Sequence, residues 1–146
     1  MRVNSETLRY FRNSPIPYKQ PKNANKRTDC GENLLSVKLA NFLREMTLTG
    51  KCKACWTKIA HETNSNSKAY GCLLRNMGKL AGVPDFIFTW ENHCLWLELK
   101  NGHGKKLSND QVFFQNWCVE TQSPHVVAYT FDEAIEILKQ AGIIEK

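Results

Sequence analysis

Apolar residues recur at helical spacing along residues 29–46, so this segment is expected to pack one face against a core. That face consists of Leu35, Leu39, Phe42, Leu43 and Met46. Asp29 and Glu32 stand three residues apart just before it, the spacing of a capping box with Asp29 as N-cap. We therefore expect a helix from Asp29 to about Met46, ended by Gly50.

Short runs rich in β-branched and aromatic residues predict four strands, at residues 53–60, 86–90, 94–100 and 125–129. Only residues 91–93 separate the second run from the third, which is short enough for a hairpin. Polar residues 61–68 predict a loop. Residues 70–80 are ambiguous and compatible with a short helix, broken by Gly78 and Gly82.

Two further capping boxes open the remaining helices. Ser108 and Gln111 begin a helix that runs to about Thr121, and Thr130 and Glu133 begin one that Gly142 ends. The resulting order is α-β-β-β-α-β-α. This alternation predicts an α/β domain of three layers, with a mixed central sheet flanked by helices.

The length of 146 residues fits one domain, and no apolar run is long enough for a membrane span. Residues 1–11 contain no apolar signal segment, so we expect a cytoplasmic chain. Disulfides are then not expected among the six cysteines. A zinc site on Cys52 and Cys55, completed by His61 and Cys72, remains an alternative, although the spacing is not a recognised one.

The positive charge is concentrated at the N-terminus. Residues 1–28 contain seven basic residues and one acidic residue, so they carry all of the net charge of +6. Three prolines among polar residues predict a flexible arm over 1–28, followed by a folded domain over 29–146. A basic arm on a neutral body indicates a polyanionic partner, with Lys26 and Arg27 as candidate nucleic-acid contacts; the alternative is a solvated tail.

Candidate chemistry centres on Asp85, Glu98 and Lys100. Residues two apart on a strand share a face, so Glu98 and Lys100 point the same way. Asp85 begins the preceding strand, and a hairpin places it beside the end of the next. Two carboxylates there would repel one another unless a cation such as Mg²⁺ lay between them. A cation and a lysine together suit phosphodiester hydrolysis. The alternative is a surface ion pair at a hairpin end.

The segments GKLAGVPDFIF, LWLELK and LSNDQVFFQNW resemble the VRR-NUC family of the PD-(D/E)xK nuclease superfamily. The likeness covers about residues 29–142. It implies a restriction-endonuclease-like fold and a Mg²⁺- or Mn²⁺-dependent DNA endonuclease. It also implies structure selectivity, with branched DNA such as Holliday junctions as substrate, and a homodimer in the cytoplasm of a bacterium or a phage-infected host.

The same resemblance implies roles for individual residues. Asp85 and Glu98 would be metal ligands with the Leu99 carbonyl, and Lys100 would be the catalytic lysine. Gln111 would assist near the site, and Glu32 would be the glutamate of the first helix. Glu32 and Gln111 are also the final residues of capping boxes, so each has a structural interpretation as well.

Several further residues are candidates for contacts with the substrate. Lys105 and Lys106 could contact the nucleic-acid backbone, and His103 stands beside them. His61, Glu62 and Asn64 form either a substrate-contacting loop or a plain polar loop. Three alternative functions remain: a sequence-specific duplex endonuclease, a non-catalytic DNA-binding module of the same fold, and a zinc-stabilised interaction domain.

Overall fold

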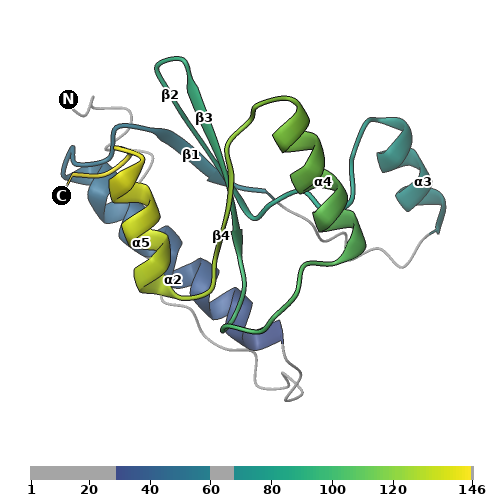
Figure 1. Ribbon diagram of the computed structural model, residues 1–146, viewed down its shortest axis with the longest axis horizontal. Helices are drawn as coiled ribbons and strands as arrows, with labels where there is room; N and C mark the ends of the chain where they lie inside the picture. The colour runs from purple at the N-terminus through teal and green to yellow at the C-terminus, as the bar shows by residue number, and fades with distance from the viewer. Residues whose placement is uncertain (1–28, 60–67, 146) are drawn as a thin grey trace.

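The computed structural model describes residues 29–59 and 68–145. Four helices and four strands occur in these ranges (Figure 1). In chain order they are α2 (Asp29–Leu48), β1 (Cys55–Lys58), α3 (Lys68–Asn76), β2 (Phe86–Trp90), β3 (His93–Leu99), α4 (Asn109–Glu120), β4 (His125–Ala128) and α5 (Phe131–Gln140). The predicted order of elements is confirmed with one addition, the helix α3, which covers the first part of the segment that the sequence left ambiguous.

The strands form one mixed sheet in the order β1-β2-β3-β4. β1 pairs antiparallel with β2, and β2 pairs antiparallel with β3 through the predicted hairpin. β4 adds in parallel to β3, because α4 carries the chain back across the sheet between them. The central hairpin is therefore covered on both edges.

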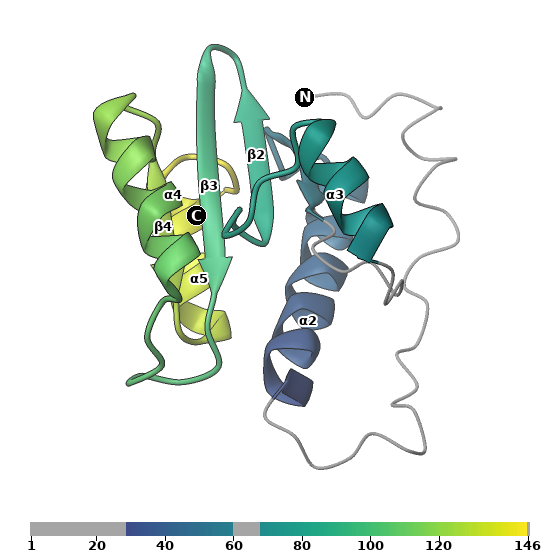
Figure 2. The ribbon, with the colours of Figure 1, turned by 90° about the vertical axis from the view of Figure 1, so that its right-hand side faces the viewer.

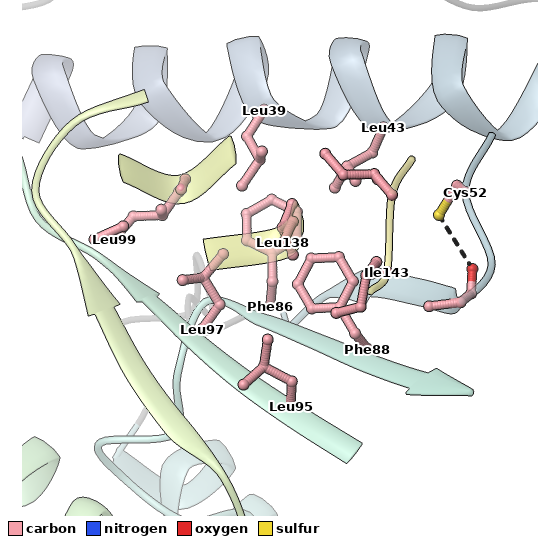
Figure 3. Close-up of a cluster of buried hydrophobic side chains, with 14 residues drawn as sticks. Leu39, Leu43, Cys52, Phe86, Phe88, Leu95, Leu97, Leu99, Leu138 and Ile143 are labelled. Atoms are coloured by element: carbon pink, nitrogen blue, oxygen red, sulfur yellow. Dashed lines mark hydrogen bonds between the residues drawn. The ribbon is translucent and has the colours of Figure 1, made fainter. Parts of the chain in front are cut away.

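The main core lies between the sheet and the pair α2 and α5. Odd-numbered residues of β3 point into it, with the rings of Phe86 and Phe88 from β2 and the apolar face of α2 (Figure 3). From α2, Leu39 and Leu43 are fully buried, as the helical spacing predicted. Leu138 of α5 and Ile143 pack between α2 and the sheet in the same core.

The opposite face of the sheet is covered by α4. The ring of Phe114 meets that of Trp96 edge-on at 5.3 Å, and Cys118 is buried one turn further along α4. Figure 2 shows the sheet standing between α4 and α2. The predicted three-layer arrangement is thus confirmed, and even-numbered residues of β3 face α4.

Several predicted boundaries were wrong. β1 begins at Cys55 and not at residue 53, because Cys52 bridges to Ile144 and the Lys53 N–H donates to the Ile143 carbonyl. The chain ahead of β1 thus pairs with the C-terminal segment. The loop predicted over 61–68 ends before Lys68, which starts α3; residues 61–67 lie outside the described ranges.

Smaller differences concern helix ends. α2 starts at Asp29, which places the predicted N-cap residue inside the helix, and it continues to Leu48. Ser108 and Thr130 are the N-caps of α4 and α5 as predicted. No helix in the described part of the chain is both long and apolar enough to cross a membrane.

Candidate active site

Asp85 lies where the hairpin prediction placed it, at the end of the sheet beside the last residues of β3. The β2–β3 register pairs Phe86 with Leu97, so Asp85 adjoins Glu98. The Leu99 N–H donates to Asp85 Oδ2 at 2.9 Å, and the Asp85 carbonyl accepts from the Ile59 N–H at 2.7 Å. The backbones of both neighbouring strands therefore hold Asp85 in place.

Glu98 and Lys100 share a face of β3, as the alternation predicted. Lys100 Nζ lies 3.2 Å from Glu98 Oε1, and the two residues are only 9% and 3% exposed. Charged side chains are seldom buried to this extent unless they are paired or bind an ion. The pair thus forms a polar centre at the edge of an apolar core.

Gln111 connects the start of α4 to this polar centre. It has both of the roles that the sequence suggested, as a helix-capping residue and as a polar residue of the site. Its Oε1 accepts from the Ser108 N–H at 2.9 Å, and its own N–H donates to Ser108 Oγ at 3.3 Å, which completes the capping box. Its Nε2 donates to Glu98 Oε1. One amide therefore caps α4 and orients a buried carboxylate.

Gly82 allows the start of α4 to lie close enough to the sheet for Gln111 to reach Glu98. Its φ is +76°, and a Cβ at this position would overlap the backbone carbonyl of Asp110. The loop ahead of Asp85 is consequently in close contact with the first turn of α4. A larger residue at position 82 would push Gln111 away from Glu98.

The carboxylate of Glu98 is in an unfavourable environment for its charge. Burial, and secondly the charge of Asp85, raise the pKa of Glu98 to about 7, although Lys100 acts in the opposite direction. Lys100 alone therefore does not compensate for the burial of Glu98 and for its repulsion by Asp85. A divalent cation between the two carboxylates would favour the charged form of both.

The number of protein ligands also bears on which metal fits. Within residues 29–59 and 68–145, no three His, Cys, Asp or Glu side chains are grouped so that they could hold a metal ion. Asp85 and Glu98 could supply two carboxylate ligands, and water or phosphate oxygens would then complete the coordination of a metal. Mg²⁺ is commonly bound in this way, whereas structural zinc requires four protein ligands.

A cleft of about 740 Å³ opens over these residues, between α2, α3 and the start of α4. Predicted site residues lining it are Glu32, Asp85, Glu98, Lys100 and Gln111. The structure thus brings together all five predicted catalytic side chains. Glu32 comes from the first turn of α2, where Asp29 lies within the helix and not at the N-cap, so the capping box predicted for Asp29 and Glu32 is not supported.

Three basic residues that line this cleft were not predicted from the sequence: Lys58, Arg75 and Lys79. Lys58 Nζ lies 2.9 Å from Asp85 Oδ1 and donates to Ser36 Oγ at 3.2 Å. A lysine at the end of an edge strand resembles an ordinary exposed position. Only the pairing of β1 with β2, which the sequence did not specify, places it beside Asp85.

Other predicted contacts lie elsewhere. His103 pairs with Glu133 at 2.9 Å and stacks on Tyr129, so it faces α5. Lys105 and Lys106 are exposed and are not among the described residues that line the cleft. Five further candidates lie outside the described residues: Lys26, Arg27, His61, Glu62 and Asn64.

The proposed zinc ligands are not grouped in the described part of the chain. Cys52 is buried and its thiol donates to the Ala54 carbonyl, whereas Cys55 is exposed on β1. Cys72 is exposed on α3, where it accepts a hydrogen bond from Arg75. These positions give no support to the zinc-stabilised alternative.

Fold and site together define a mixed α/β domain with two acidic residues and a lysine at the end of its central hairpin, which is the predicted restriction-endonuclease-like architecture. A solved structure described as a VRR_NUC domain protein has this fold, with a TM-score of 0.57 and 17% sequence identity. The match covers 75% of this chain and 86% of that chain. No model of a known protein family and no curated protein matches this chain.

Proposed function

We propose that this protein is a metal-dependent DNA endonuclease. The observation that carries the proposal is the convergence of Asp85, Glu98 and Lys100 in one cleft, on a fold shared with a VRR_NUC domain protein. Mg²⁺ or Mn²⁺ bound there would activate water and offset charge on the phosphate.

Each residue has a distinct task in this proposal. Asp85 and Glu98 hold the cation, together with the Leu99 carbonyl, and Gln111 keeps Glu98 oriented. Lys100 orients the attacking water or offsets the negative charge that develops on the phosphate. Glu32 faces the same cleft from α2 and contributes a further carboxylate to it.

The proposed substrate is branched DNA. Lys58, Arg75 and Lys79 give the cleft a basic wall suited to phosphates, and phosphate contacts position a nucleic acid without reading its sequence. A protein that binds mainly the sugar–phosphate backbone of DNA distinguishes its substrates by their shape. We include Lys105 and Lys106 as outer backbone contacts.

Cleavage is expected to require Mg²⁺ or Mn²⁺ and to fail with Ca²⁺. Ca²⁺ accepts longer bonds, about 2.3–2.6 Å, and a looser geometry, so it would bind without aligning the water. The measurement is cleavage of a labelled four-way junction in each metal and in EDTA. Full activity in EDTA would contradict the metal mechanism.

The arm over residues 1–28 is proposed to bind DNA. Deletion of the arm is expected to weaken DNA binding and to flatten its salt dependence. Each lost phosphate contact reduces the magnitude of the negative slope of log K against log salt by roughly 0.9. The measurement is the binding constant of the full chain and of residues 29–146 at several salt concentrations. Equal slopes would mean that the arm does not contact DNA.

We also propose a homodimer. The outer side of α4 exposes apolar side chains, including Phe113 (66%) and Trp117 (45%), which an interface would remove from water. Phe113→Glu is expected to shift the mass measured by light scattering from dimer to monomer. Gln140→Glu on α5 makes the same charge change and serves as the control. A wild-type chain that is monomeric at high concentration would exclude the dimer.

A further inference from the structure

Lys58 is the last residue of β1 and extends across the end of the sheet. Its ammonium contacts Asp85 Oδ1 at 2.9 Å and Ser36 Oγ at 3.2 Å, and it lies 5.5 Å from the centre of the Phe86 ring. Ser36 is buried in α2, whereas the Lys58 side chain is 41% exposed. Lys58 therefore links α2 to Asp85 while remaining accessible from the cleft.

Both carboxylate oxygens of Asp85 already have a partner in the structure. Oδ2 accepts the Leu99 N–H, and Oδ1 is engaged by Lys58. On Glu98, by comparison, both Gln111 and Lys100 contact Oε1. Asp85 and Glu98 thus each have their own lysine, but only the lysine of Asp85 is substantially exposed.

We propose that Lys58 is a positioning residue whose ammonium pairs with Asp85 before a metal binds. Once the metal is bound, the ammonium leaves Asp85 and pairs with a substrate phosphate. The inference rests on the proposed function, since it concerns the same metal and nucleic acid. An ammonium within hydrogen-bonding distance of a metal ligand opposes the cation that would share that ligand. Nucleic acid in the cleft would give Lys58 another anion and relieve this opposition.

Two opposite effects follow for a variant without this charge. The protein alone should bind metal more tightly, because repulsion is lost. The same variant should bind nucleic acid more weakly, because one phosphate contact is lost. A purely structural role for Lys58 would instead weaken both, since disturbing Asp85 harms the metal site as well.

The test measures Mn²⁺ binding by calorimetry to the full chain without nucleic acid. Lys58→Met is expected to bind Mn²⁺ about two- to fivefold more tightly than wild type, the range set by an exposed ion pair. Lys58→Arg retains the charge and should match wild type. Lys53→Met removes an exposed lysine that does not line the cleft in the described structure, and it should have no effect.

The second arm measures binding of a four-way junction in Ca²⁺ at several salt concentrations. Lys58→Met is expected to reduce the salt slope by about 0.9, the value of one phosphate contact. Unchanged or weaker Mn²⁺ binding by Lys58→Met would overturn the proposal, and so would an unchanged salt slope. A wild-type chain that binds Mn²⁺ but cuts no DNA would contradict the proposed nuclease activity. In that case the comparison of Mn²⁺ binding between Lys58→Met and wild type would still test the role of Lys58.

Discussion

Lys100→Met is expected to lower single-turnover DNA cleavage by about 10²–10⁴-fold, the usual effect of losing a positioned proton-transfer or charge-stabilising group. Lys100 is almost fully buried, and its ammonium lies 3.2 Å from Glu98 Oε1, so it faces the proposed metal and not bulk solvent. Met preserves the length of the apolar stem. The charge alone is removed from the cleft.

Binding should not fall with activity in this variant. Removing an ammonium beside Glu98 relieves repulsion toward a divalent cation, so metal and DNA are expected to bind at least as well as in wild type. Lys53→Met is the matched control, because Lys53 is exposed, lies outside the described lining of the cleft and has no proposed contact with DNA. If Lys100→Met loses binding in proportion to activity, Lys100 is a phosphate anchor; if it still cuts, Lys100 is not catalytic.

Asp85→Asn and Glu98→Gln are each expected to abolish cleavage while leaving DNA binding largely intact. Both substitutions keep the side-chain shape but remove a charged ligand. An amide oxygen at position 85 can still accept the Leu99 N–H, and one at position 98 can still accept from Gln111. The measurements are single-turnover cleavage and junction binding on one preparation of each variant.

The fold of Glu98→Gln should survive for a further reason. Burial already disfavours the charge of Glu98, as the rise of its pKa to about 7 shows, so a neutral isostere suits this position. A thermal melt in EDTA provides the folding control. Cleavage near the wild-type rate by a folded variant of either residue would mean that the site is misplaced.

Much of this arrangement could be predicted because it depends on local periodicity. The alternation in β3 and the short connection predicted after β2 were sufficient to place Asp85 beside Glu98, since a hairpin has few possible registers. Capping boxes located the starts of α4 and α5, because the spacing reflects hydrogen bonds within one turn. These features need no knowledge of distant contacts.

What the sequence did not predict depends on long-range pairing. β1 begins late because residues ahead of it pair with the C-terminal segment, some ninety residues away. Lys58 joins the site only through the pairing of β1 with β2. The joint role of Gln111 requires the close packing of the Gly82 loop on α4, which no local pattern reveals.

The central claim is tested most directly by incubating the full chain with Mg²⁺ and matched linear, flapped and four-way-junction DNA under single-turnover conditions, beside Asp85→Asn purified in parallel. The expected result is cleavage by wild type alone, fastest on the branched substrates and absent in EDTA. Wild type that cuts none of the three, or Asp85→Asn that cuts as fast as wild type, would contradict the assignment of this cleft as a nuclease site.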